Sequence, residues 1–491
     1  MTRVELKQGG LRGSEREGVH AFLGIPYAAP PVGAARFAAP GPAPTWSGER
    51  DATRYGPTAP QPEGRMPGVD FSAIGGPGWV RGEESLTVNV WTPDPGAAGL
   101  PVLVFLHGGA FVSGSGSGAG YDGTRFAQDG VVLVTLNYRV GVAGYASLEG
   151  APDNRGLLDQ IAALHWVREN IAAFGGDPER VTVSGESAGG MSVAALLAAA
   201  PAGLFRRAVS QSGGGCASVT RAQAASASRQ LAELLGARPS AESFARFSDG
   251  ELVGALSELL LRRPGLAVDG ARHPLMGLTP LSTVIDGELL TGQAAEMVAA
   301  SSASGVDLLL GSNAEEFNFY TVGLGISVPD AELPSAAAPL HPDPDAVAAA
   351  YRAAGRGDPY SALGTDYVFA VPTKRLADAH APHGAGTWRY EFAWSSPGFD
   401  GRLGACHGLE LPFVFDNVGR VDYGDLGIPD DDPTRELSRR THRAWVDFAT
   451  TGDPGWPQYA VDRPTVQRIG TTWTTTELAD GPERALWDGV L

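Results

Sequence analysis

The chain contains little cysteine: only Cys216 and Cys406 occur among 491 residues. Two thiols cannot form the disulfide framework of a small secreted domain. No Cys-x-x-Cys or His-x-x-x-His pair is present, and His380 and His383 have no convincing third ligand near them. The sequence therefore excludes a disulfide scaffold and predicts no metal site.

Basic residues are also scarce, with 37 Lys and Arg against 55 Asp and Glu and a net charge of −18. Nucleic acids and anionic membranes attract basic patches, so we expect neither as a partner. No apolar run approaches the roughly 20 residues that span a bilayer, and the densest one is Met191 to Ala200. Met1 to Gly10 carries charges and no continuous apolar core, unlike a signal peptide. We therefore expect a cytoplasmic location.

The pentapeptide Gly185-Glu186-Ser187-Ala188-Gly189 is the most informative motif present. It follows the apolar run Val181 to Val183 and precedes the helix-forming stretch Met191 to Ala200, which indicates a strand, a sharp turn and a helix. Glycines on both sides leave room for a turn that lifts a serine hydroxyl clear of the sheet edge. The motif predicts that Ser187 is a nucleophile.

A second glycine motif, His107-Gly108-Gly109-Ala110-Phe111, follows the apolar run Val102 to Leu106. A glycine pair directly after a strand allows backbone N–H groups to point freely. Such donors stabilise the oxyanion that forms when a nucleophile adds to a carbonyl. We expect Gly108 and Gly109 to form an oxyanion hole with Ala188, the residue after the nucleophile.

Two later segments supply an acid and a base in the chain order serine, acid, histidine. The apolar Leu308 to Leu310 predicts a buried strand, which leads into a loop that contains Glu315 and Glu316. We predict that Glu316 is the acid and that Glu315 is solvated or paired at the surface. His407, in a loop of small residues, is the predicted general base.

These motifs together resemble the type-B carboxylesterases, the family of cholinesterases and para-nitrobenzyl esterases. The resemblance runs nearly from end to end and includes further matching segments: Phe22 to Gly33, Arg36-Phe37, Asn137 to Gly141, Asn154 to Gln160, and Phe174 to Pro178.

The resemblance implies an α/β-hydrolase fold, with a mostly parallel central sheet flanked by helices. The sequence agrees, because Val131 to Asn137 is apolar throughout, as in a strand buried on both faces. From Asn154 the apolar residues recur at helical spacing until Gly175-Gly176. We expect residues 1–491 to form a single catalytic domain, with helical cap insertions at roughly 222–300 and 328–385.

The chain departs from the family at one disulfide. Glu83-Glu84-Ser85-Leu86 stands where the family has Glu-Asp-Cys-Leu, and Ala59-Pro60-Gln61 stands where it has Cys-Pro-Gln. Loss of both halves indicates a chain that does not meet an oxidising compartment. The sequence does not decide whether Cys216 and Cys406 form a disulfide, but it favours two free thiols.

The resemblance also marks residues around the predicted site. It implies that Glu186 is a buried, hydrogen-bonded carboxylate, and that Ser212 either supports the site or is only a turn serine. We expect apolar pocket walls from four aromatic residues, which could instead belong to the core: Phe111, Trp79, Phe317 and Phe319.

The function predicted from these features is that of a serine carboxylic-ester hydrolase that works through an acyl-enzyme on a small-molecule ester. No cofactor is implied, because every step is a proton transfer or an addition to a carbonyl. One alternative is a catalytically silent adhesion or binding protein of the same fold, although such relatives typically lack a triad member. Another is hydrolysis of lactones, amides or aromatic polyesters. The natural ester and the oligomeric state stay open.

Overall fold

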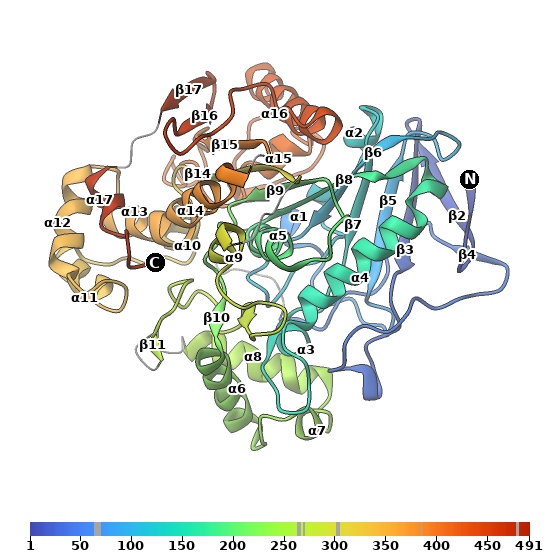
Figure 1. The fold of residues 1–491 in the computed structure, drawn as a ribbon, viewed down its shortest axis with the longest axis horizontal. Coiled ribbons are helices and arrows are strands. Elements are labelled where there is room, and N and C mark those ends of the chain that lie inside the picture. The colour runs from blue at the N-terminus through green and yellow to red at the C-terminus, as the bar shows by residue number, and fades with distance from the viewer. Residues whose placement is uncertain (63–69, 263–266, 269–270, 301–304, 384, 478–480) are drawn as a thin grey trace.

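One large β-sheet runs through the molecule (Figure 1), which is described here from a computed structural model. The structure describes residues 1–491 except 63–69, 263–266, 269–270, 301–304, 384 and 478–480. Within the described residues the sheet has thirteen strands. Twelve follow one another across the sheet in this order: β1 (Thr2–Leu6), β2 (Gly9–Arg16), β3 (Val19–Pro26), β5 (Thr87–Thr92), β7 (Val132–Leu136), β6 (Leu100–Leu106), β8 (Gly176–Glu186), β9 (Arg207–Gln211), β14 (Asp307–Asn313), β15 (Thr387–Phe392), β16 (Thr465–Ile469) and β17 (Thr474–Glu477). The thirteenth, β4 (Glu49–Asp51), pairs with β2.

The strands from β7 to β16 pair in parallel, and antiparallel strands flank them on both sides. In the shared register, Leu106 lies beside Gly185, Gly185 beside Ser210, and Ser210 beside Leu310. The carboxyl ends of β6, β8, β9 and β14 therefore meet at one edge, which is where open α/β sheets place ligands. This architecture confirms the predicted fold class.

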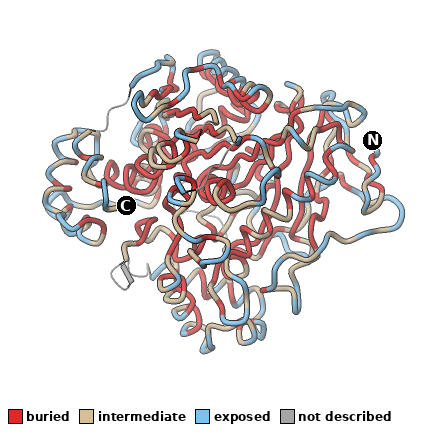
Figure 2. Tube along the Cα trace, in the orientation of Figure 1, coloured by how far each residue is buried: buried red, intermediate tan, exposed pale blue. Residues whose placement is uncertain are grey.

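The apolar runs form the central strands, as the sequence predicts. Side chains alternate across β6: Val102, Val104 and Leu106 join one hydrophobic core, while Leu103 and Phe105 join the other. Figure 2 shows the buried residues concentrated along these strands. A strand buried on both faces has no solvent side, which explains why its sequence is apolar throughout.

Helices cover the two faces. The core that contains Val102 is completed by α4 (Arg155–Asn170) and α5 (Ala188–Ala199), and the core that contains Leu103 by α16 (Asp432–Thr451). Helix α4 ends in a 3₁₀ turn, Ile171–Phe174, after which Gly175 takes a left-handed φ of 83°. The glycine stop that the sequence predicts is present there.

Most of the remaining helices lie in the two segments for which cap insertions are expected. The first holds α6 (Arg221–Leu235), α7 (Ala241–Phe244), α8 (Asp249–Arg262) and α9 (Ala294–Ala300). The second holds α11 (Leu333–Ala337), α12 (Pro344–Ala354), α13 (Pro359–Thr365), the π-helix Asp366–Ala370 and α14 (Val371–His380). Figure 1 shows α6 to α8 grouped together and α11 to α13 beside α17 (Pro482–Ala485). Helices α9 and α14 instead pack on each other, with α9 also against α5 and α14 against β14.

Cys216 and Cys406 are both free and buried, as the sequence favours. None of the helices in the described ranges combines the length and apolar character that crossing a bilayer would require.

A buried ion pair joins the loop after β7 to α4. The Arg139 guanidinium donates to both carboxylate oxygens of Asp159, from Nη2 at 2.7 Å and from Nε at 2.8 Å. The two side chains are 1% and 0% exposed. Arg139 Nη1 also donates to the Ala38 carbonyl at 2.7 Å. The pair therefore connects three separate segments around the sheet.

We predict that Asp159→Ala lowers the free energy of unfolding by about 3–5 kcal/mol, because it leaves a buried guanidinium without a counter-charge. Urea denaturation followed by circular dichroism measures the loss. As a control, Glu179→Ala removes the exposed Arg168–Glu179 pair, whose side chains are 42% and 72% exposed, and should cost less than about 1 kcal/mol. Equal losses in the two variants would contradict the prediction.

Candidate active site

Ser187 occupies the turn between β8 and α5. Its φ of 56° and ψ of −124° are strained for a residue with a side chain, and such strain concentrates at functional sites. The glycines of the motif permit the turn: a Cβ on Gly189 would collide with the Leu106 carbonyl oxygen, and one on Gly185 would lie 2.5 Å from the Gly189 carbonyl carbon. The predicted strand, turn and helix are all present.

His407 and Glu316 complete a chain of hydrogen bonds from Ser187. His407 Nε2 lies 2.8 Å from Ser187 Oγ, and His407 Nδ1 lies 2.6 Å from Glu316 Oε2. A carboxylate beside Nδ1 favours the tautomer that carries its proton there, so Nε2 is free to accept from the serine hydroxyl. The three residues are 8%, 4% and 0% exposed in the order serine, histidine, glutamate. The structure thus brings together the three residues that the sequence singles out.

Two donors orient the Glu316 carboxylate. Its Oε1 accepts from Ser212 Oγ at 2.6 Å and from the Asn313 backbone N–H at 2.7 Å. Ser212 therefore contacts the predicted acid, which agrees with the interpretation that it supports the site rather than being only a turn serine. Sequence reasoning missed Asn313, although it stands at the end of the predicted strand and three residues before the acid.

Glu315 fits the paired alternative of the sequence expectation rather than the solvated one. It is half-buried, its Oε2 accepts from the Ala405 backbone N–H at 2.9 Å, and its own N–H donates to the Ala405 carbonyl at 3.0 Å. The two neighbouring carboxylates both contact the loop that contains His407. Glu315 accepts from the backbone of that loop, and Glu316 bonds to the His407 imidazole.

The loop after β6 lies against Ser187. A Cβ on Gly108 would be 3.0 Å from Ser187 Cβ and 2.8 Å from Glu186 Oε2, so only glycine fits there. Gly109 takes a φ of 112°. In the part of the chain that the structure describes, no protein acceptor takes a hydrogen bond from the amides of Gly108, Gly109 or Ala188. These amides are free to bind a ligand oxygen.

Side chains that sequence reasoning missed brace this loop. Gln61 bonds to the Gly114 backbone through both its oxygen, at 2.7 Å, and its nitrogen, at 3.0 Å. Tyr138 stacks on the His107 ring and donates to the His107 carbonyl at 2.7 Å. Burial lowers the pKa of His107 to about 4, so the ring is neutral at pH 7, with Nδ1 2.7 Å from the Gly108 carbonyl.

Two further carboxylates, Glu186 and Glu410, are buried beside the histidine. Glu186 Oε1 lies 3.3 Å from His407 Nε2. Glu186 is 2% exposed and Glu410 is 0% exposed. Burial raises the pKa of Glu186 to about 8; the His407 charge opposes this rise, and Glu410 and Glu316 add to it. Among the described residues Glu186 Oε1 has no hydrogen-bond donor, so the expectation of a hydrogen-bonded carboxylate is wrong for this atom.

The same carboxylates act on His407. Burial by itself lowers the pKa of the imidazole, but the charges of Glu186 and Glu316 outweigh it and raise the pKa to about 9. Glu410, which the sequence analysis did not identify, adds to this rise. It is held by Gln211 Nε2 at 3.1 Å and Asn313 Nδ2 at 2.8 Å.

Three aromatic rings surround the imidazole, and only one of them belongs to the predicted pocket wall. The ring centroids of Phe369, Tyr320 and Phe319 lie 4.7, 5.7 and 6.1 Å from that of His407. Phe319 is the predicted residue. Phe369 lies in the π-helix, and no sequence pattern there indicates that a side chain reaches the histidine.

The other predicted wall residues lie elsewhere. Phe111 is fully buried against Tyr145, and half-buried Trp79 stacks under Arg81. Phe317 packs on Tyr320 and Tyr360. Among the described residues, no aromatic contact joins these three rings to His407. The core reading therefore fits Phe111 and Phe317 better than the pocket reading.

The described part of the chain contains no group of three His, Cys, Asp or Glu side chains that could hold a metal ion. The arrangement instead provides a serine hydroxyl, a base, an acid and free amides around one point.

A parallel sheet with a strained serine turn at its carboxyl edge defines an α/β-hydrolase. Comparison with known proteins gives the narrower class. The model of the Carboxylesterase family matches residues 1–328 and 349–483, and the chain belongs to this family. It is accordingly a serine carboxylic-ester hydrolase.

Relatives match over nearly the whole chain. The para-nitrobenzyl esterase of Bacillus subtilis (strain 168) is 38% identical over 472 residues, covering 93% of this chain and 92% of the relative. The liver carboxylesterase of Sus scrofa is 33% identical over 526 residues, covering 96% and 89%. Among solved structures, the carboxylesterase EST55 of Geobacillus stearothermophilus has a TM-score of 0.85 at 35% identity, covering 99% and 100%.

We predict that Glu186→Gln shifts the acid limb of the pH profile of kcat/KM to lower pH, by about one unit or more. As the predicted general base, His407 must be neutral to accept a proton, and its pKa is raised above the ordinary 6.5, so we expect the rate to increase as pH rises through that pKa. Removing the Glu186 charge removes the largest of the contributions that raise the His407 pKa. The exposed-site variant Glu179→Gln should leave the limb in place, and an unchanged or raised limb in Glu186→Gln would contradict the assignment.

Proposed function

We propose that Ser187, His407 and Glu316 are the catalytic triad of this ester hydrolase. The observation that supports it is the continuous hydrogen-bond chain from Ser187 Oγ through the imidazole to the Glu316 carboxylate. A catalytically silent binding protein would not need this chain, and all three side chains are retained.

In the acylation step, Ser187 Oγ attacks the ester carbonyl carbon while His407 Nε2 takes the hydroxyl proton. Negative charge forms on the carbonyl oxygen, and the amides of Gly108, Gly109 and Ala188 donate hydrogen bonds to it. Ala188 is also the first residue of α5, where the helix dipole favours negative charge. Glu316 stabilises the imidazolium and keeps its orientation.

The intermediate collapses when the carbon–oxygen bond to the alcohol breaks and His407 returns its proton to that oxygen. A water molecule then attacks the acyl-serine, with His407 again as base, and releases the carboxylic acid and free Ser187. Every proton and electron pair is accounted for by the three side chains and water.

The substrates we propose are small uncharged esters with an apolar or aromatic group. Phe369, Tyr320 and Phe319 present apolar rings next to the base, and the buried carboxylates disfavour an anionic substrate. The name of the para-nitrobenzyl esterase relative points to the same class.

We further propose that the chain is one catalytic domain located in the cytoplasm. One hydrogen-bonded site draws on residues from Ser187 to His407, which supports a single unit, with α6 to α8 and α11 to α13 as its cap. The two free thiols and the absence of the family disulfide support a reducing compartment.

We predict that Ser187→Ala lowers kcat/KM for p-nitrophenyl esters by at least about 10⁴-fold, because the nucleophile is lost while the oxyanion donors stay. A series of acyl chains from acetate to octanoate gives the acyl preference of the wild type. Mass mapping after treatment with a phosphonate should place the label on Ser187 alone. Substantial turnover by the alanine variant, or a label on another serine, would overturn the assignment.

We predict that Glu316→Gln lowers kcat by up to about 10⁴-fold, since an amide cannot stabilise the imidazolium and favours the wrong tautomer. The adjacent Glu315→Gln is the matched control and should keep most of the activity, because an amide oxygen still accepts from the Ala405 N–H. Steady-state kinetics on one p-nitrophenyl ester compares them. The reverse pattern would assign the acid to Glu315.

A further inference from the structure

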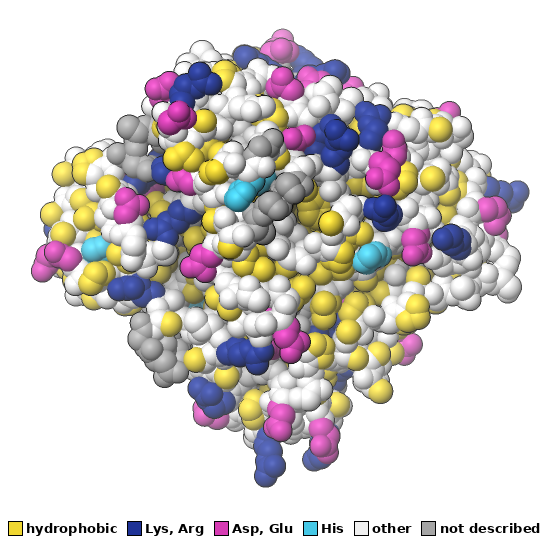
Figure 3. Space-filling view, in the orientation of Figure 1, with side chains coloured by type: hydrophobic (Ala, Val, Ile, Leu, Met, Phe, Trp, Pro, Cys, Tyr) yellow, Lys and Arg dark blue, Asp and Glu magenta, His cyan; other side chains and the backbone are white. Residues whose placement is uncertain are grey.

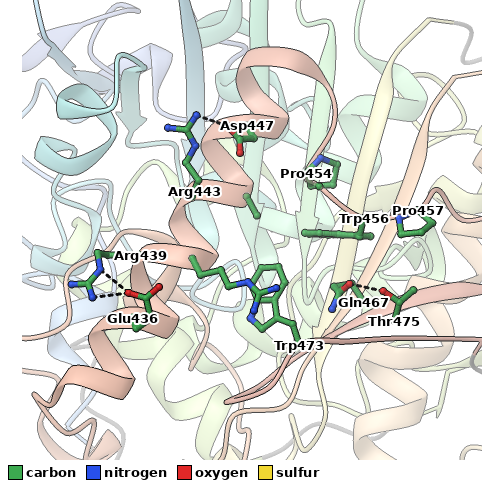
Figure 4. Close-up of a pocket in the computed structure, with 13 residues that line it drawn as sticks. Glu436, Arg439, Arg443, Asp447, Pro454, Trp456, Pro457, Gln467, Trp473 and Thr475 are labelled. Carbon is green, nitrogen blue, oxygen red and sulfur yellow. Dashed lines mark hydrogen bonds and ion pairs between the residues drawn. The ribbon is translucent and has the colours of Figure 1, made fainter.

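A cavity of about 630 Å³ lies between α16 and the β16–β17 hairpin (Figure 4). Its lining comes from three segments: α16, the loop 454–457, and the hairpin. None of Ser187, His407 and Glu316 lines it. A volume of this size accommodates one small organic ligand.

Two tryptophans form the apolar part of the lining. Trp456 and Trp473 meet edge to face, with ring centroids 5.9 Å apart, and Figure 4 shows them reaching toward α16 from the loop and the hairpin. Trp456 is only 6% exposed. In the described part of the chain, neither buried indole N–H has an acceptor. The indole nitrogens themselves are buried, so what the two rings contribute to the cavity is aromatic surface.

Three arginines of α16 form the polar part. Figure 4 shows Arg439 paired with Glu436 and Arg443 paired with Asp447, at 2.7 and 2.8 Å. Arg440 stacks over the Trp473 ring, 4.2 Å from its centroid, and no carboxylate of the described residues pairs with it. The cavity thus retains one uncompensated positive charge in a chain whose net charge is −18.

We propose that this cavity is a binding site for the monoanion of an aromatic carboxylic acid. A guanidinium that stacks on an indole keeps its N–H edge free, and that edge matches a carboxylate in a two-bond geometry. The ligand ring packs against Trp456 and Trp473. Arg440 is exposed, so its charge stays hydrated beside a neutral ligand, and the site favours the anion through the charge-assisted hydrogen bond that only a carboxylate gains. The proposal does not depend on the catalytic assignment.

Isothermal titration calorimetry with 2-naphthoate tests the site in the full-length chain. Wild type should bind with one saturable site, and Arg440→Gln and Trp473→Leu should each weaken binding by about tenfold or more, as expected when a charge-assisted hydrogen bond or its aromatic support is lost. Arg439→Gln is the matched control on the same helix and should stay within about twofold, because Glu436 already neutralises Arg439. 2-Naphthamide should bind at least about tenfold more weakly than 2-naphthoate.

Each contrary result overturns the proposal: no binding of 2-naphthoate to wild type, equal binding to Arg440→Gln, or equal binding of 2-naphthamide. Thermal melting of each variant verifies that it is folded. If naphthoate binds at the catalytic centre instead, it will compete with an ester substrate, and its affinity will be unchanged in Arg440→Gln and Trp473→Leu. That result would also contradict the proposal.

Discussion

The hydrogen bond between His407 Nδ1 and Glu316, 2.6 Å long, fixes the orientation of the imidazole, and the geometry of the site follows from it. It holds Nε2 toward Ser187 Oγ and determines which ring nitrogen accepts. It can form because Glu316 follows β14 and His407 follows β15, the parallel strand next to it, and Ser187 follows β8 at the same edge of the sheet, with β9 between β8 and β14. The fold therefore acts on the chemistry by aligning strand ends that are far apart in the sequence, such as Glu186 of β8 and Asn313 of β14.

Burial of this site has opposing effects. A low-dielectric environment strengthens the hydrogen bonds of Glu316, and it would also strengthen the attraction between Glu316 and the imidazolium of the proposed mechanism. The same environment disfavours charge on Glu186 and Glu410, and it raises the pKa of both. The structure limits this cost by giving Glu410 two amide donors. Glu186 instead lies 3.3 Å from His407 Nε2, and the charges of the two groups shift each other's pKa.

The face of the sheet opposite α5 is connected to the same network. On α16, Trp445 donates from Nε1 to Gln211 Oε1 at 3.1 Å, and Gln211 donates to Glu410. The outer side of α16 carries Arg440 and lines the cavity beside Trp473. One helix therefore supports the buried carboxylates on its inner side and presents a cationic, aromatic surface on its outer side.

The sequence by itself determined the central strands of the sheet, the turn at Ser187 and the glycine loop at Gly108, because each depends on local patterns. The order of the motifs and the resemblance to the family singled out Glu316 and His407. Apolar runs mark strands buried on both faces, and flanking glycines mark a turn that excludes side chains. Only the tertiary structure decided the surroundings of these residues. Phe369 reaches His407 from a π-helix about 50 positions after the acid, and Glu315 is captured by the Ala405 backbone. Burial and such long-range contacts leave no periodic signal, because they arise when separate segments pack.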